Sequence, residues 1–167
     1  MSRAFVAILM GSKSDLPVME KTAEVLKSLD VPFEMKITSA HRTPDATHAY
    51  VKDAEARGCR VFICAAGLAA HLAGAVAGII TRPVIGVPLD AGPLQGLDSL
   101  MSTVQMPGGV PVATVAVGNA GAKNAAYLAA QILGVADPAI AERVATERAA
   151  NAAAVIAADA ELQASLR

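Results

Sequence analysis

Residues 32–44 read PFEMKITSAHRTP, a stretch that predicts a strand, a polar loop and the start of a helix. Apolar and polar side chains alternate through Ile37, as in a β-strand, and Thr43-Pro44 is typical of a helix N-terminus, with Thr43 at the cap position. The loop places the imidazole of His41 beside the cation of Arg42. Because ligands bind open α/β sheets at the carboxyl ends of the strands, this loop is a candidate functional site.

The same order of strand, loop and helix repeats along the chain. We predict strands over 4–10, 32–37, 60–65, 84–87 and 111–117, and helices over 16–29, 43–56, 69–80, 98–105 and 122–133. Most of these strands are continuous apolar runs, as in parallel sheets that are covered on both faces. The expected fold class is therefore α/β, a flavodoxin-like three-layer sandwich with a five-stranded parallel sheet and an extra C-terminal helix.

The alanine-rich segment after Asp137-Pro138 predicts that extra helix. Its apolar face is thin, but Val155 and Ile156 are too apolar to leave in water. We therefore expect this helix to pack on another subunit rather than fray in solvent.

The composition excludes several kinds of partner. The formal net charge is −1, so the chain lacks the basic field that attracts nucleic acid or an anionic membrane surface. Apolar residues make up 54% of the chain and aromatic residues only 3%. A small chain this apolar is expected to bury part of its surface between subunits, which indicates a homo-oligomer.

The cysteines and the N-terminus indicate a cytoplasmic protein. Cys59 and Cys64 flank or lie on one predicted strand, five residues apart, so we expect their side chains on opposite faces of the sheet and both thiols reduced. The N-terminus has no pattern of a secretion signal. Residues 61–81 carry no formal charge and could span a bilayer by length, but their glycines and His71 favour a buried strand, a turn and a helix.

Five loops follow the predicted strands and should meet at one edge of the sheet, because parallel strands all end there. They span 11–15, 39–42, 66–71, 88–96 and 118–121. Their hydroxyls, cations, carboxylate and imidazoles suit a phosphorylated sugar, and they belong to Ser12, Ser14, Ser39, Lys13, Arg42, Asp15, His41 and His71.

Each of these signals is weak alone. Lys13 is equally consistent with a solvated side chain, and Asp15 with a cap of the first helix. His48 falls inside the second predicted helix, where a structural role is expected. Residues 11–14 do not form a Walker loop, and three histidines without clustered cysteines or carboxylates give no support for a metal site.

Five motifs together carry a family resemblance. In chain order they are GSKSD at 11–15, SAHRTP at 39–44, AAHL at 69–72, GLDSL at 96–100 and VQMPGG at 104–109. They resemble the bacterial-type (class I) N5-carboxyaminoimidazole ribonucleotide mutases of purine biosynthesis. This resemblance implies a flavodoxin-like homo-octamer that uses neither metal nor organic cofactor. It also implies transfer of a carboxyl group from the exocyclic N5 to ring carbon C4 of an aminoimidazole ribonucleotide.

The resemblance assigns roles to residues. The substrate-binding residues would be Ser12, Asp15, Ser39, Arg42, Gly67 and Leu72, and the catalytic residues would be His41 and His71. Carbon dioxide would leave N5, stay bound transiently and join C4, with His41 as general acid and base. Residues 1–136 would form the catalytic domain, and residues 137–167 would form a C-terminal helical extension at the oligomer interface.

Two positions depart from the family pattern, which usually has glycine and proline where this chain has Leu68 and Ala73. We expect these two residues to alter the rigidity and shape of the loop around His71, and the rate more than the reaction itself.

Two other functions stay open. Direct carboxylation of aminoimidazole ribonucleotide with carbon dioxide, as in the animal-type relatives, would share the second half of the chemistry. The second is a flavodoxin-like nucleotide-binding module without catalysis, whereas a purely structural protein would not need His41 and Arg42 at the ligand edge. The chain has few aromatic residues to stack a flavin, and residues 65–67 lack the acceptor aspartate of a phospho-receiver.

Overall fold

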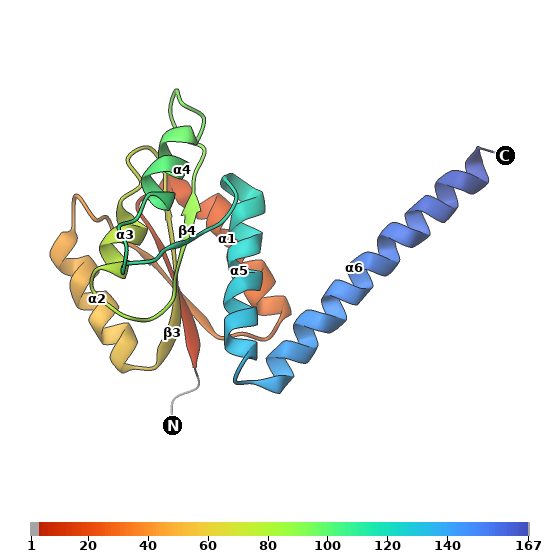
Figure 1. Ribbon diagram of the computed structural model, residues 1–167, viewed down its shortest axis with the longest axis horizontal. Helices are drawn as coiled ribbons and strands as arrows, with labels where there is room; N and C mark the ends of the chain where they lie inside the picture. Colours follow the sequence, from red (N-terminus) through yellow and green to blue (C-terminus); the bar gives the residue numbers. More distant parts are fainter. Residues whose placement is uncertain (1–3, 167) are drawn as a thin grey trace.

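A computed structural model describes residues 4–166 of the chain, and its centre is a five-stranded parallel sheet (Figure 1). The strands are β1 (Phe5–Met10), β2 (Phe33–Ile37), β3 (Cys59–Ala66), β4 (Val84–Pro88) and β5 (Ala113–Thr114). Their order in the sheet is β2-β1-β3-β4-β5, which is the flavodoxin-like order, so the predicted fold class is confirmed. The strand order reverses between β1 and β3, and in such sheets ligands bind beside that point.

Helices cover both faces of the sheet and give the three predicted layers. α1 (Leu16–Ser28) and α5 (Gly118–Gly134) pack together on one face, and α2 (Pro44–Ala56) and α3 (Leu72–Ala77) lie on the other (Figure 1). α4 (Leu97–Val104) contacts β4 and β5. A single turn of 3₁₀ helix, η1 (Lys13–Asp15), joins β1 to α1.

Each face of the sheet buries its own apolar cluster, because side chains alternate along the strands. In β3, Val61 and Ile63 face the cluster under α1 and α5, whereas Phe62 and Cys64 face the cluster under α2 and α3. All four side chains are fully or almost fully buried. Residues 61–81 therefore form a buried strand, a turn and a short helix as expected, and no helix within residues 4–166 is long and apolar enough to cross a membrane.

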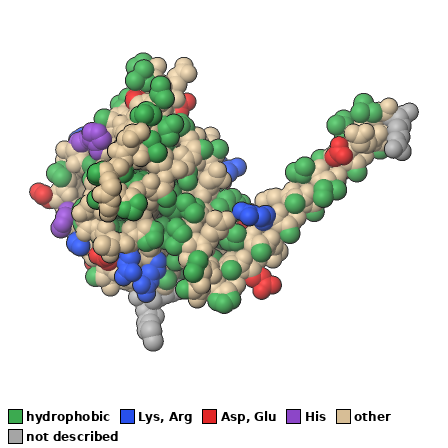
Figure 2. Space-filling view, viewed as in Figure 1, with side chains coloured by type: hydrophobic (Ala, Val, Ile, Leu, Met, Phe, Trp, Pro, Cys, Tyr) green, Lys and Arg blue, Asp and Glu red, His purple; other side chains and the backbone are tan. Residues whose placement is uncertain are grey.

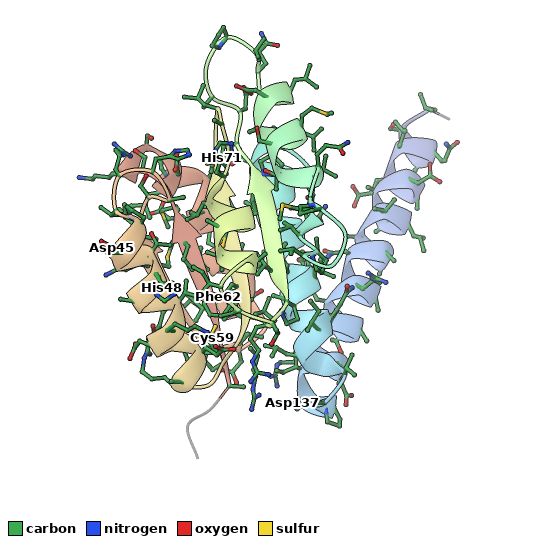
Figure 3. All side chains as sticks on the ribbon, turned by 60° about the vertical axis from the view of Figure 1, so that its left-hand side comes forward. Asp45, His48, Cys59, Phe62, His71 and Asp137 are labelled. Carbon is green, nitrogen blue, oxygen red and sulfur yellow. The ribbon has the colours of Figure 1, made fainter. Side chains whose placement is uncertain are left out.

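The predicted placement of the two cysteines on opposite faces is wrong. Phe5 pairs with Cys59 but Val6 pairs with Val61, so Arg60 is an extra residue in β3 at this point. This bulge shifts the alternation by one residue, and Cys59 joins Cys64 in the cluster that also contains Phe62 (labelled with Cys59 in Figure 3). Both thiols are free, as expected, and burial raises the pKa of Cys59 to about 12.

Three predicted elements have different bounds in the structure. The helix predicted over 69–80 is confined to α3, because residues 69–71 form a turn in which the His71 amide donates to the Ala69 carbonyl. The strand predicted over 111–117 is reduced to the two residues of β5, the last strand in the sheet order. The helix predicted over 122–133 begins earlier, at Gly118.

The C-terminal helix α6 (Pro138–Ser165) leaves the body as an arm (Figure 1). The carboxylate of Asp137 accepts hydrogen bonds from the amides of Ala139 and Ile140, which begins the helix. Its buried residues are Ile140 and Val144, close to this first turn. Further along, Val155 and Ile156 are each 71% exposed, and apolar side chains follow one another along the arm (Figure 2).

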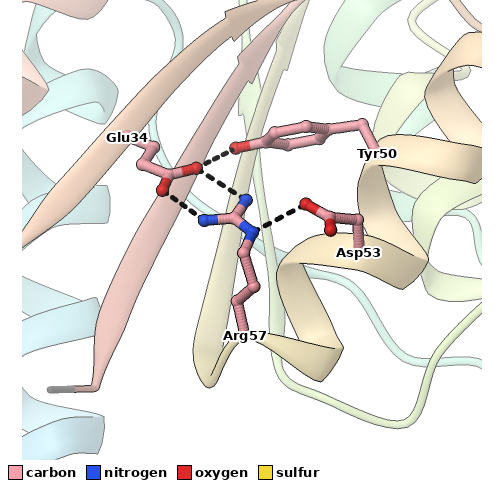
Figure 4. Close-up of polar contacts among 4 residues, drawn as sticks. All are labelled: Glu34, Tyr50, Asp53 and Arg57. Carbon is pink, nitrogen blue, oxygen red and sulfur yellow. Dashed lines mark hydrogen bonds and ion pairs between the residues drawn. The ribbon is translucent and has the colours of Figure 1, made fainter. Parts of the chain in front are cut away.

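A polar network joins α2 to β2 (Figure 4). The guanidinium of Arg57 donates to the Glu34 carboxylate, with Nη2 2.9 Å from Oε2, and to Asp53, with Nε 2.6 Å from Oδ2. The Tyr50 hydroxyl also donates to Glu34, at 3.2 Å. The hydrogen bond from Arg57 lowers the pKa of Glu34. Such half-exposed ion pairs stabilise a fold little, and this one ties the start of β2 to the C-terminal end of α2.

Candidate active site

The loops after β1, β2 and β3 enclose a pocket of about 460 Å³ at the carboxyl end of the sheet. The structure places in its lining all the residues that the resemblance singled out: Ser12, Asp15, Ser39, His41, Arg42, Gly67, His71 and Leu72. Figure 3 shows His71 near one end of the sheet, with Cys59 toward the other. Residues far apart in sequence therefore share one site.

The loop after β1 is held by a reciprocal pair of hydrogen bonds. The Ser12 amide donates to Oδ2 of Asp15 at 2.9 Å, and the Ser12 hydroxyl accepts from the Ser14 amide at 3.3 Å. Asp15 thus closes a capping box around η1 rather than capping α1. Burial raises the pKa of the Asp15 carboxyl, and the hydrogen bonds from Ser12 and Ser14 only partly offset this effect.

The loop after β2 is held mainly by hydrogen bonds of its side chains. The Ser39 hydroxyl accepts from the Arg42 amide at 3.1 Å, and Arg42 Nη2 donates to the Gly11 carbonyl at 2.9 Å. Thr43 occupies the cap position of α2 as predicted, but its hydroxyl accepts from the Ser39 amide at 2.9 Å instead of capping the helix. The loop is therefore a closed turn that presents His41 and Arg42 to the pocket.

The two histidines of the pocket form a direct hydrogen bond. Nε2 of His41 lies 2.7 Å from Nδ1 of His71, although the residues are 30 positions apart. Their rings meet edge to face, with centroids 4.8 Å apart. One of the two nitrogens must carry the proton of this bond and the other must accept it, so the bond relates the tautomer of one ring to that of the other.

The loop after β3 and the start of α3 supply an apolar wall of small residues and two leucines. It consists of Ala66, Gly67, Leu68, Ala69 and Leu72. At Gly67 a Cβ atom would lie 2.7 Å from the Cβ of Ala91, so no larger residue fits there without movement. The pocket thus has one polar side, which can bind an anion and hydroxyl groups, and one apolar side.

The expected single rim is divided into two pockets. Of the loop after β4, only Ala91 lines the pocket with the histidines. Gly118 and Asn119 lie with Asp90 in a neighbouring pocket of about 510 Å³, which shares Ser14, Asp15 and Ala91 with the first. Ala91 was not predicted from the sequence as a pocket residue. The only feature of the sequence that points to it is its position shortly after a strand that ends at the ligand edge.

Two predicted alternatives concern residues outside the site. Lys13 is exposed and lines neither of these two pockets, which agrees with a solvated side chain. His48 lies on an exposed position of α2 (Figure 3). Within residues 4–166, no group of three or more His, Cys, Asp or Glu side chains is placed to hold a metal ion.

Comparisons with known proteins agree on one family. The family model described as AIR carboxylase matches residues 5–154. The N5-carboxyaminoimidazole ribonucleotide mutase of Thermotoga maritima is 59% identical over 139 residues, which cover 83% of this chain and 80% of the relative. The protein of the same name from Mycobacterium tuberculosis is 51% identical over 161 residues, covering 96% and 91%. A crystal structure of Treponema denticola PurE superposes with a TM-score of 0.87 at 35% identity, covering 96% and 99%.

Proposed function

The chain belongs to the AIR carboxylase family, and on this premise we propose that it is an isomerase of de novo purine biosynthesis. It moves the carboxyl group of N5-carboxyaminoimidazole ribonucleotide from N5 to C4, giving 4-carboxy-5-aminoimidazole ribonucleotide. The observation that carries the mechanism is the hydrogen bond between His41 and His71, which both line the pocket.

The polar side of the pocket binds the ribose phosphate. Arg42, Ser12 and Ser39 offer a cation and two hydroxyls to the phosphate group, and Asp15 accepts hydrogen bonds from ribose hydroxyls. Oδ2 of Asp15 already accepts from the Ser12 amide, so the carboxylate is oriented before the substrate binds. Fixing the substrate in this way can contribute about 7–11 kcal/mol to lowering the barrier.

The reaction requires one proton to move from C4 to N5. When the N5–carboxyl bond breaks, the electron pair stays on nitrogen, carbon dioxide is released and N5 takes up a proton. C4 then attacks the carbon dioxide, and the new C–C bond leaves C4 with a proton that must be removed to restore the aromatic ring. His41 gives the first proton and takes the second, so it ends the cycle as it began, and His71 can pass or hold a proton through Nδ1.

The apolar side of the pocket holds the carbon dioxide between these two steps. Ala66, Gly67, Ala69 and Leu72 present no nucleophile, and Leu72 is almost fully buried. A dry wall of this kind keeps a neutral gas close to C4 and limits its hydration.

A paired assay on the pure protein tests this function. One cuvette contains N5-carboxyaminoimidazole ribonucleotide, and the other contains aminoimidazole ribonucleotide with bicarbonate. Efficient formation of the C4-carboxylated product from the first substrate alone is the expected result. Efficient formation from the second alone would assign the chain to the direct carboxylases, and no product in either would leave a binding module.

We further propose that the enzyme is a cytoplasmic homo-oligomer, an octamer by its family resemblance. The division into a catalytic domain, 1–136, and an interface extension, 137–167, is supported by the exposure of Val155 and Ile156 on α6. The buried free thiols Cys59 and Cys64 suit a reducing compartment.

Light scattering tests the assembly. The wild-type chain is expected to have the mass of an octamer, and Val155→Asp combined with Ile156→Asp is expected to give smaller species, because charges would be buried at the interface. Glu142→Ala, on the same helix, serves as the control. A monomeric wild type would contradict the proposed assembly.

A further inference from the structure

Leu68 adopts a backbone conformation that leucine rarely occupies. Its φ is 55°, in the left-handed region, where a residue with a Cβ is strained and glycine is not. Burial does not account for the leucine, because its side chain is 51% exposed. A residue that is strained and half exposed calls for a local explanation.

The side chain of Leu68 lies directly on Gly92, in the loop after β4. A Cβ atom on Gly92 would be 2.5 Å from Cδ2 of Leu68, so the leucine occupies the space that any other residue at position 92 would need. Gly92 itself has a φ of 74°. Two left-handed residues on different loops are thus packed against each other.

This contact ends a row of contacts between the two loops. The Leu89 amide donates to the Ala66 carbonyl at 3.0 Å, which extends the pairing of β3 with β4 beyond the strands. Gly67 then packs on Ala91, and Leu68 on Gly92. We call this row, residues 66–68 against 89–92, the seam. Ala66, Gly67, Leu68 and Ala91 all line the pocket that contains the histidines, so the seam is part of its wall.

We propose that Leu68 is a positioning residue that closes the seam and keeps the released carbon dioxide in the pocket; this inference rests on the proposed function. Glycine at position 68 would relieve the backbone strain but would leave the end of the seam open and the loop free to move. The leucine spans from one loop to the other and excludes water from the apolar wall. Its strain is offset by this closure, which explains why a leucine stands there.

Isotope retention measures this closure directly. The substrate carries ¹³C in its N5-carboxyl group and the solution contains unlabelled bicarbonate with carbonic anhydrase, so that any carbon dioxide which escapes is replaced by unlabelled gas. The wild type is expected to retain most of the label in the C4-carboxylated product. Leu68→Ala keeps the Cβ strain but removes the contact, and the ratio of escaped to retained label should rise by about 5-fold, the order expected when half-buried methyl groups are lost.

Three further variants separate the contact from a general effect on folding. Leu68→Met restores an apolar side chain of similar reach and should return retention close to the wild-type value. Leu68→Gly should lose label at least as readily as Leu68→Ala, although it relieves the strain and should raise Tm by about 2–4 °C relative to Leu68→Ala. Gly92→Ala places a methyl group against Leu68 and should also lose label, while Gly108→Ala, in open space, should not.

The outcomes are distinguishable. If the wild type makes labelled product and Leu68→Ala retains the label equally well, the inference is overturned and the proposed function stands. If the wild type makes no C4-carboxylated product from the carbamate, the proposed function fails and this inference fails with it. Loss of label in Leu68→Ala that is reversed in Leu68→Met supports both.

Discussion

The loops after β2 and β3 each deliver one histidine to the same hydrogen bond, but they are held in different ways. The loop that carries His41 is fixed by hydroxyl and guanidinium hydrogen bonds from Ser39, Arg42 and Thr43. The loop that carries His71 is fixed by close packing of small residues on the neighbouring loop. Polar groups tolerate small shifts in geometry better than a close backbone contact does. The first loop should therefore respond to loss of a side chain, and the second to gain of one.

The largest effect is expected where the two loops meet. His41→Asn keeps a hydrogen-bonding side chain but removes the imidazole that gives and takes the proton, so kcat should fall by about 10²–10⁴-fold while the product still binds. Steady-state kinetics and calorimetric titration of the product measure the two effects. His48→Asn, on an exposed position of α2, is the matched control. A kcat near that of the wild type would remove His41 from the mechanism.

Arg42→Ala should act mainly on binding. A hydrogen bond to a charged group contributes about 1.5–3 kcal/mol, so KM should rise roughly 10- to 100-fold with a smaller change in kcat. Arg42→Ala also loses the hydrogen bond to the Gly11 carbonyl. Arg42→Lys keeps the charge but not the planar set of donors, so its KM should lie between those of the wild type and Arg42→Ala. An unchanged KM would contradict the phosphate role.

Gly67→Ala tests the packed loop. Its new Cβ would lie 2.7 Å from that of Ala91, and overpacking of this kind costs about 1–3 kcal/mol. We expect a lower Tm and a lower turnover, because the apolar wall must shift. Gly108→Ala meets no atom within 4 Å and should change neither quantity. Equal behaviour of the two variants would show that the loop is not held by close packing.

Thr43→Val tests the polar loop with a smaller change. The valine has a similar shape but cannot accept from the Ser39 amide, so the free energy of unfolding should fall by about 1 kcal/mol. Because Thr43 does not line the pocket, kcat should change little. Chemical denaturation and initial rates measure the two effects. A loss of turnover without a loss of stability would mean that the threonine acts in the site.

The smallest effect concerns Asp15, in the loop after β1. Burial raises its pKa above the ordinary 3.8, so the folded state binds the proton more tightly than the unfolded state does. The stability that this provides is present in acid, below 3.8, and is lost as the pH rises through the folded-state pKa. As the pH rises through this range, the free energy of unfolding of Asp15→Asn should therefore increase relative to that of the wild type, as chemical denaturation at each pH would measure. A difference that is constant with pH would contradict this.

Much of the fold is readable from the sequence because apolar runs are bounded by glycine and proline. β1, β2, β4, α1, α2 and α4 differ from their predicted bounds by no more than about one residue at each end. α3 and β5 are shorter than predicted, because some of the apolar residues in 69–80 and 111–117 lie in turns or beside the edge strand rather than in the elements themselves. The resemblance and the strand order together placed the site residues in one pocket.

Other features could not be read from single residues. No residue type in the sequence marks the bulge at Arg60, so strict alternation predicts the wrong face for Cys59. Thr43 is at the cap position as the sequence predicts, but its hydroxyl bonds to Ser39 instead of the helix, and the sequence alone does not show this closed turn. The His41–His71 bond depends on how closely two loops approach, which the strand order alone does not give. Leu68 was visible only as a departure from the family pattern.

The bulge at Arg60 reverses the parity of β3, that is, whether its odd or its even positions face a given side of the sheet. Every residue of β3 after Arg60 keeps one assignment of odd and even positions to the two faces, and Cys59 before it has the opposite assignment. Arg60 is thus the point where β3 can gain or lose one residue without inverting the part that leads to the pocket. A one-residue deletion further along, between Val61 and Ala65, would turn the β3 side chains that follow it toward the opposite faces of the sheet. An insertion or deletion at Arg60, which is exposed and lies at the opposite end of β3, would therefore leave the side chains that lead into the active-site loop on their present faces.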